Sequence, residues 1–148
     1  MTETTHVPPD SHESKVIIHG KQNHCFGCGQ TNPAGLKLEF TKISEGTVFT
    51  DAVISNNYEG PPGYLHGGII ATILDEAMSK ANRSRGVTAM TRQMQVDYLL
   101  PVPSGSPIRI EGEVTKTEGR KHWTEARVKN PEGITFARAT GLFIAIQR

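Results

Sequence analysis

One helical pattern stands among six strand patterns, and this imbalance limits the folds that the chain can adopt. Apolar side chains recur at helical spacing between Gly68 and Asn82, so one face of a helix can pack on a sheet there. The members of this stripe are Ile70, Ile73, Leu74, Ala77 and Ala81. The strand patterns cover residues 36–43, 47–54, 89–100, 106–116, 121–129 and 134–146, with turn-forming residues between them. We therefore expect an α+β domain in which a six-stranded antiparallel sheet wraps around one long central helix.

The length of the chain bounds its domain organisation. Its 148 residues suffice for one domain with a sizeable core and are too few for two. Residues 1–22 are polar, contain Pro8 and Pro9 and show little periodicity, so we expect a flexible N-terminal arm before a single domain over residues 23–148. One helix cannot cover both faces of such a sheet, and open sheet edges pair readily. A homodimer, or a tetramer built as a dimer of dimers, is therefore expected.

The charge balance excludes several classes of partner. Lys and Arg number 16 against 15 Asp and Glu, a formal net charge of +1, so neither nucleic acid nor a membrane surface is expected to bind. No apolar stretch approaches the length of a bilayer span, and the N-terminus lacks the apolar centre of a signal peptide. These features predict a cytoplasmic protein.

The two cysteines, Cys25 and Cys28, are too few for a disulfide scaffold and are consistent with a reducing compartment. They cannot close a structural zinc site alone, and together with His24 they would supply only part of one. We expect a tight turn that holds two thiols and no metal. A redox dithiol stays open as an alternative, although the strand and helix that flank a thioredoxin-like motif are missing.

Gly67 and Gly68 stand at the start of the predicted helix, where backbone N–H groups are unpaired and the helix dipole is positive. Without a Cβ, glycine lets a carbonyl group approach the backbone closely, and the N–H groups would stabilise the negative oxygen that develops when that carbonyl is attacked. The alternative is an ordinary turn from loop to helix.

Two carboxylates follow on the same helix, and their spacing separates them. Glu76 precedes Lys80 by four residues, the favourable order for a solvent-exposed ion pair. Asp75 has no such partner, and Ala71 and Met78 leave an apolar margin beside it. A partly desolvated carboxylate has a raised pKa and is a stronger base, as activating a water or attacking a carbonyl requires. The alternative for Asp75 is a solvated surface group.

The segment from Pro62 to Met78, which contains His66, Gly67, Gly68 and Asp75, resembles the core motif of the PaaI-like thioesterases of the hotdog superfamily, the 4-hydroxybenzoyl-CoA thioesterase type. The resemblance extends over residues 23–146. It implies a hotdog fold and hydrolysis of an acyl-CoA thioester to a free acid and CoA. Coenzyme A is then part of the substrate, and no separate cofactor is expected.

The resemblance also implies roles for individual residues. Asp75 would be the general base or the nucleophile, the Gly67 amide would polarise the thioester carbonyl, and His66 would orient the loop or the substrate. Thr91, at the spacing of a helper Ser or Thr on the following strand, would assist the carboxylate or its water. The alternative for Thr91 is a place on a polar strand face that it would share with Gln93.

Substrate binding is expected at residues on both sides of the motif. Some relatives carry an Asn or Gln about six residues before the histidine, where this chain has Gly60. Asn57 stands farther away, so the oxyanion site is expected to rest mainly on backbone amides, with Asn57 and Gly68 as substrate-binding candidates. CoA carries phosphates, and a chain of low net charge needs local cations to bind them. Lys116, Arg120 and Lys121 bracket one turn and are the candidates, although basic residues beside a turn are usually just solvated.

Two other functions compete with hydrolysis. One is hydration of an acyl-CoA, which other hotdog proteins perform with an Asp and a His five residues apart. No His follows Asp75 at that distance, so this reaction is not expected. Non-catalytic acyl-CoA binding is the remaining alternative. The sensors of that kind which resemble this fold carry a DNA-binding head, and residues 1–22 are too short and irregular for one.

Overall fold

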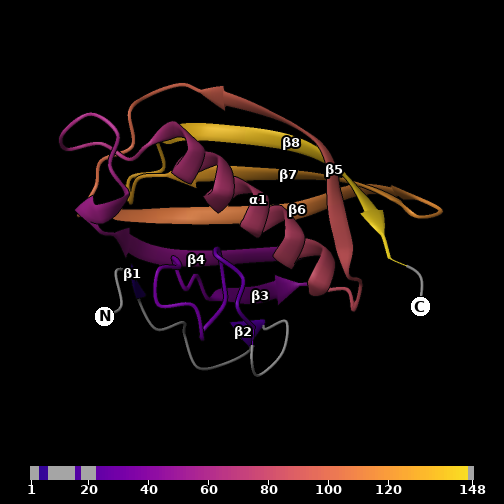
Figure 1. Ribbon diagram of the computed structural model, residues 1–148. Coiled ribbons are helices and arrows are strands. Elements are labelled where there is room, and N and C mark those ends of the chain that lie inside the picture. Colours follow the sequence, from indigo (N-terminus) through magenta and orange to yellow (C-terminus); the bar gives the residue numbers. More distant parts are fainter. Residues whose placement is uncertain (1–3, 7–15, 18–22, 147–148) are drawn as a thin grey trace.

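The computed structural model describes residues 4–6, 16–17 and 23–146. Its elements are, in order, β1 (Thr4–His6), β2 (Val16–Ile17), β3 (Phe40–Ser44), β4 (Thr47–Ile54), the 3-10 turn η1 (Asn56–Tyr58), α1 (Gly67–Arg83), β5 (Ala89–Tyr98), β6 (Pro107–Glu118), β7 (Lys121–Lys129) and β8 (Thr135–Ala145). The strands pair antiparallel in the order β2-β3-β4-β6-β7-β8-β5, with β1 beside β4. Figure 1 shows this sheet curving around α1. One helix against one antiparallel sheet agrees with the expected hotdog arrangement.

Two details of the predicted fold are wrong. The sheet has eight strands rather than six, because the short strands β1 and β2 add to it from within residues 1–22; the rest of the predicted arm lies outside the described residues. The central helix is not long. Its 17 residues rise about 25 Å, whereas the 12 residues of β6 span about 40 Å. Within the described part of the chain, no helix combines the length and the apolar character needed to cross a bilayer.

The first long strand begins later than its alternating pattern predicts. The amides of Leu36 and Leu38 donate to the carbonyls of Phe26 and Gly27 at 2.8 and 2.9 Å, so they bond to a turn instead of a neighbouring strand. Lys37 between them has a φ of 53°, which interrupts the extended backbone. Both leucines are nevertheless buried. The pattern therefore identifies the core side chains correctly and the strand incorrectly.

The helix α1 lies unusually close to the middle of the sheet. Its stripe residues Ile73, Leu74 and Ala77 are fully buried, as the spacing predicts. Opposite them on β6 stands Gly112, where an added Cβ would lie only 2.3 Å from the Ala77 carbonyl oxygen. The absence of a side chain at this position therefore determines how near the helix sits to the sheet.

We expect Gly112→Ala to lower the free energy of unfolding by about 1–3 kcal/mol, because the methyl group would force the helix away from β6. Urea denaturation measures the change, and Thr117→Ala, an exposed substitution on the same strand, serves as the control. Equal stability of the alanine variant and the unaltered protein would show that the close approach does not constrain the fold.

Candidate active site

The start of α1 leaves one backbone amide open. His66 caps the helix: its Nδ1 accepts a hydrogen bond from the Gly68 N–H at 2.9 Å, and its carbonyl accepts from the amides of Ile69 and Ile70. Because Nδ1 accepts, the proton of the neutral ring is on Nε2. Among the described residues, the exposed Gly67 N–H has no hydrogen-bond partner. Of the two glycine amides expected to face a substrate, only that of Gly67 is therefore available.

Tyr98, at the end of β5, holds the carbonyl side of the same residue. Its hydroxyl donates to the Gly67 carbonyl oxygen at 2.8 Å, and the ring is about half exposed. This bond ties the first turn of the helix to the sheet. Sequence reasoning missed Tyr98, since no spacing rule connects it to a glycine 31 positions away.

Asp75 and Thr91, which the sequence places on different elements, meet in the structure. The Thr91 hydroxyl donates to Asp75 Oδ1 at 2.5 Å. The bond joins the middle of α1 to the beginning of β5, so the carboxylate is held in one orientation by a strand rather than by its own helix. The expected juxtaposition of the two side chains is present; their roles in a reaction stay a prediction.

A β-bulge explains why Thr91 faces the helix. In the pairing of β5 with β8, Thr91 is opposite Phe143 and Gln93 is opposite Leu142, so Arg92 is an extra residue. A bulge of this kind shifts the alternation of side chains by one position. Thr91 and Gln93 consequently point to opposite faces of the sheet, and the alternative in which they share one polar face is wrong.

The environment of Asp75 favours its neutral form. Burial raises the pKa of the carboxyl group above its ordinary value, the Thr91 hydrogen bond opposes this, and the nearby negative charge of Glu76 adds to the increase. No described residue forms an ion pair with Asp75. A half-buried carboxylate without a cation, fixed by one hydroxyl, has the properties of a general base or a nucleophile.

The predicted ion pair between Glu76 and Lys80 exists, but its expected place on the solvent-exposed surface is wrong. Lys80 Nζ lies 3.2 Å from Glu76 Oε2, and the lysine is 1% exposed. The segment around Cys25 covers this side of the helix, with the Cys25 thiol donating to Glu76 Oε1 at 3.3 Å. Glu76 is thus fully engaged, and Asp75 remains the carboxylate that is free to react.

The basic residues expected near a nucleotide lie at the turn between β6 and β7, and all three are exposed. Lys116 Nζ lies 4.8 Å from the centroid of the Trp123 ring and 3.9 Å from a Glu118 oxygen. Arg120 Nε donates to the Ala145 carbonyl, and Lys121 makes no described side-chain contact. Their cationic groups can therefore reach a solvent-borne phosphate.

The strand register separates the predicted site residues into two groups. Lys121 pairs with Ile144, which in turn pairs with Met90, so the basic turn is level with Thr91 at the start of β5. The Gly67 carbonyl is bonded to Tyr98 at the other end of that strand. Figure 1 likewise shows the tip between β6 and β7 far from the beginning of α1.

Asn57 belongs to the second of these groups. It lies exposed in η1, on the loop before the helix, where its amide N–H donates to the Ser55 hydroxyl oxygen at 2.9 Å. Gly60, on the same loop, packs so closely that an added Cβ would lie 3.2 Å from the His66 Cα. A larger side chain at position 60 would therefore require the loop to move.

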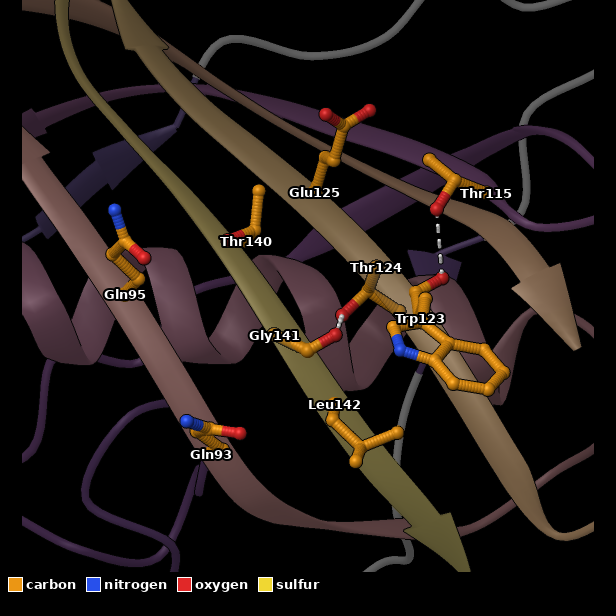
Figure 2. A pocket seen from close by; sticks show the side chains of 9 residues that line it. All are labelled: Gln93, Gln95, Thr115, Trp123, Thr124, Glu125, Thr140, Gly141 and Leu142. Atoms are coloured by element: carbon orange, nitrogen blue, oxygen red, sulfur yellow. Dashed lines mark hydrogen bonds between the residues drawn. The ribbon is translucent and has the colours of Figure 1, made fainter.

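The outer face of the sheet carries a groove of about 420 Å³ that is distinct from these residues. Gln93, Gln95 and Leu142 line it together with Trp123, whose ring Figure 2 shows in front of the strands while α1 lies behind them. Neither Asp75 nor Gly67 borders the groove. The carboxylate and the open amide therefore lie on the other side of the sheet.

Comparison with known sequences gives consistent results. The sequence pattern of the thioesterase superfamily matches residues 62–137. Over 89 residues the chain is 37% identical to acyl-coenzyme A thioesterase THEM4 of Xenopus laevis, a match that covers 60% of this chain and 40% of that protein. The chain thus spans about two fifths of the length of this relative.

Solved structures share the fold. A crystal structure described as a thioesterase superfamily protein superposes with a TM-score of 0.79 and 28% identity, over 92% of this chain and 68% of the other. The BH2602 protein of Bacillus halodurans, crystallised with CoA, gives a TM-score of 0.66 and 25% identity over 76% of each chain. The helix and the sheet that carry Asp75, Thr91 and Gly67 are therefore shared with proteins of this kind.

We expect Asp75→Asn to stabilise the protein at neutral pH. A group whose folded pKa is raised contributes stability below its unfolded pKa of about 3.9 and loses that contribution as the pH rises through the folded pKa. The advantage of the variant should therefore be smallest in acid and grow towards pH 7. Urea denaturation at several pH values measures it, with Asp97→Asn, whose carboxylate pairs with exposed Arg138, as the matched control. A stability advantage over the unaltered protein that is no larger at pH 7 than in acid would contradict the burial of this charge.

Proposed function

Since the chain belongs to the thioesterase superfamily, we propose that it hydrolyses an acyl-CoA thioester to a free acid and CoA. The observation that carries the proposal is the half-buried Asp75 carboxylate, held by Thr91 and unpaired with any described cation. The name of the THEM4 relative and the CoA in the Bacillus halodurans structure support the class of substrate. The PaaI-like, 4-hydroxybenzoyl-CoA type of enzyme and a cytoplasmic location are finer parts of the same proposal.

In this proposal Asp75 either accepts a proton from the attacking water or attacks the thioester carbonyl itself. Both roles need an ionised carboxylate with a raised pKa, because a weakly solvated carboxylate is the stronger base. The Thr91 hydroxyl keeps one carboxylate oxygen fixed, which leaves Oδ2 to face the water or the substrate. Thr91 is therefore a positioning residue for the base.

The Gly67 N–H supplies the oxyanion site. No described residue pairs with it at the first helical position, where the helix dipole adds partial positive charge, and both effects stabilise a developing negative oxygen. The His66 ring contributes by capping the Gly68 amide, which fixes the turn that presents Gly67. Asn57 and the Gly68 backbone border the entrance to this end of the site.

The two halves of the machinery are too far apart to act on one carbonyl within a single chain. Asp75 follows Gly67 by eight residues on the same helix, a rise of about 12 Å, whereas both groups must come within about 3 Å of the reacting atoms. A second chain must therefore supply one of them. In this proposal the homodimer is therefore needed for catalysis, because each site combines groups from two chains.

The edge strand β5 offers a pairing that meets this requirement. It is the last strand in the sheet order, so within the described part of the chain one of its edges has no partner strand. When two copies pair their β5 edges antiparallel about a two-fold axis near the middle of the strand, Thr91 of one copy lies level with the partner's Tyr98. Asp75 of one chain then faces the partner's Gly67 amide, and two equivalent sites form. A tetramer would arise by association of two such dimers.

The exposed turn of Lys116, Arg120 and Lys121 is the proposed binding site for CoA phosphates, since it lies level with Thr91 and offers three cations to an anionic ligand. The proposed reaction uses only carboxylate, hydroxyl and backbone groups and the CoA of the substrate itself. The acyl group that the site accepts is to be identified by experiment.

We expect Asp75→Asn to lose hydrolysis by a factor of about 10²–10⁴ and to retain CoA binding, because the amide cannot accept the proton or form the acyl intermediate. Release of free CoA from aryl, short-chain and long-chain acyl-CoAs measures turnover, with Asp97→Asn as the control. Turnover of Asp75→Asn close to that of the unaltered protein would refute the assignment. If the unaltered protein binds these esters and hydrolyses none of them, it is a non-catalytic binding protein.

Two substitutions at Gly67 distinguish loss of the backbone N–H from the effect of an added side chain: Gly67→Pro removes the N–H, and Gly67→Ala keeps it. Proline is tolerated at the first helical position and compatible with the extended His66, whose φ and ψ are −62° and 139°, so the fold should survive while the N–H is removed. We expect kcat of Gly67→Pro to fall about 10²–10³-fold, and that of Gly67→Ala to fall much less. Equal losses in both variants would indicate crowding rather than a missing hydrogen bond.

Mixing two inactive variants tests the shared site. When Asp75→Asn and Gly67→Pro chains are unfolded and refolded together, half of the dimers are mixed, and each mixed dimer contains one intact site. We therefore expect about a quarter of the unaltered activity to return. Two inactive populations that stay inactive after mixing would place both groups of each site in one chain.

A further inference from the structure

The segment with the two cysteines forms a tight turn pressed against α1, and the proposed hydrolysis does not use it. The Gly29 amide donates to the Cys25 carbonyl at 2.8 Å, which closes one helical turn over residues 25–28. A Cβ on Gly27 would lie 2.3 Å from the Glu76 Cγ, so the turn lies directly on the helix. It therefore brings both thiols to the helix face that neighbours Asp75.

The thiols and the buried ion pair form one cluster. The two Sγ atoms and a Glu76 carboxylate oxygen all lie within 4.8 Å of one another. Cys25 Sγ donates to Glu76 Oε1 at 3.3 Å, and Asn23 Nδ2 donates to Cys28 Sγ at 3.2 Å. The second carboxylate oxygen of Glu76 accepts from Lys80 Nζ at 3.2 Å.

The cluster has the donor types of a metal site but already contains a cation. Two thiols and a carboxylate are ligands that zinc accepts. The Lys80 ammonium, 1% exposed, is bonded to the carboxylate that such an ion would need, and the other carboxylate oxygen accepts the Cys25 thiol. A metal ion would have to displace a buried, paired ammonium or add uncompensated charge beside it. Joining the two sulfur atoms instead adds no charge to the interior.

We propose that Cys25 and Cys28 are a redox modification site that forms a reversible disulfide by exchange with a low-molecular-weight disulfide such as glutathione disulfide. The helical turn places residues three apart with Cβ atoms about 5–6 Å from each other, and a disulfide needs about 3.5–4.5 Å. A slight tightening of the turn and rotation of the side chains close this gap. The bond would link residues that are already neighbours, so the fold is kept.

The two cysteines have different surroundings, which assigns their order of reaction. Cys25 is partly exposed and Cys28 is buried, with 6% of its surface accessible. Burial, followed by the negative charge of Glu76, raises the pKa of the Cys28 thiol to about 12. Cys25 is therefore the thiol that meets an external disulfide, and Cys28 is the one that resolves the intermediate.

The exchange balances in two steps. Cys25 attacks one sulfur of glutathione disulfide, the S–S bond breaks, and one glutathione leaves with the proton of the Cys25 thiol. Cys28 then attacks the Cys25 sulfur of the mixed disulfide, and the second glutathione leaves with the proton of Cys28. The protein dithiol is oxidised and one glutathione disulfide is reduced to two glutathione thiols. The disulfide product lacks the S–H group of Cys25, which donates a hydrogen bond to Glu76 Oε1 in the reduced protein.

The test equilibrates the folded protein in buffers of reduced and oxidised glutathione and follows intact mass and free thiols. We expect a species lighter by two hydrogen atoms with no free thiol, restored by excess reduced glutathione. Cys28→Ser should accumulate one glutathione on Cys25, because the resolving thiol is gone. Cys25→Ser should stay unmodified, because Cys28 is buried. The two variants are matched controls for each other, and neither readout depends on hydrolysis.

Several results would overturn the proposal. Two free thiols in the native protein at all ratios of oxidised to reduced glutathione would leave the turn with a purely structural role. Equal glutathione adducts on both single variants would contradict the assigned order. One zinc ion per chain that protects both thiols, found in protein purified without chelator, would replace the redox site with a metal site.

Discussion

The approach of α1 to the sheet at Gly112 is the constraint on which the other features depend. Because no side chain separates the Ala77 carbonyl from β6, the helix sits low in the curve of the sheet. At this depth Asp75 comes within reach of a hydroxyl on β5, and the first turn comes within reach of Tyr98. The same depth leaves the opposite flank of the helix to be covered by a separate segment. A helix held farther out would lose both contacts to β5 together.

That covering segment gives the helix two chemically different flanks. On one side, the turn around Cys25 buries Glu76 and Lys80 as a neutral pair. On the other side, Asp75 meets a single hydroxyl and no described cation. The two adjacent carboxylates thus have opposite environments. Glu76 is paired with a buried lysine, whereas the negative charge of Asp75 has no described cation beside it. A charge held at a cost in stability is typical of functional sites.

Periodicity and spacing predicted the parts of this arrangement that depend on local sequence. The apolar stripe located α1 to within one residue at each end, and the hairpins followed from their turn residues. Three features escaped because long-range contacts decide them. Leu36 and Leu38 bond to a distant turn, Lys80 is covered by a segment far away in the chain, and the contact between Tyr98 and Gly67 joins two elements. The meeting of Asp75 with Thr91 was expected from resemblance rather than from the physics of either element.

The bulge at Arg92 has a consequence for how such chains can diverge. Downstream of it, the two faces of β5 exchange their side chains relative to a regular strand, so Thr91 belongs to the inner face and Gln93 to the outer groove. Loss of the Arg92 codon would convert the bulge into a regular pairing and would leave Thr91 on the inner face, because cross-strand partners share a face and Thr91 would stay opposite the buried Phe143. In evolutionary terms, a related gene could lose this codon and keep the carboxylate's helper in place, although the number of residues between Asp75 and the later part of β5 would differ.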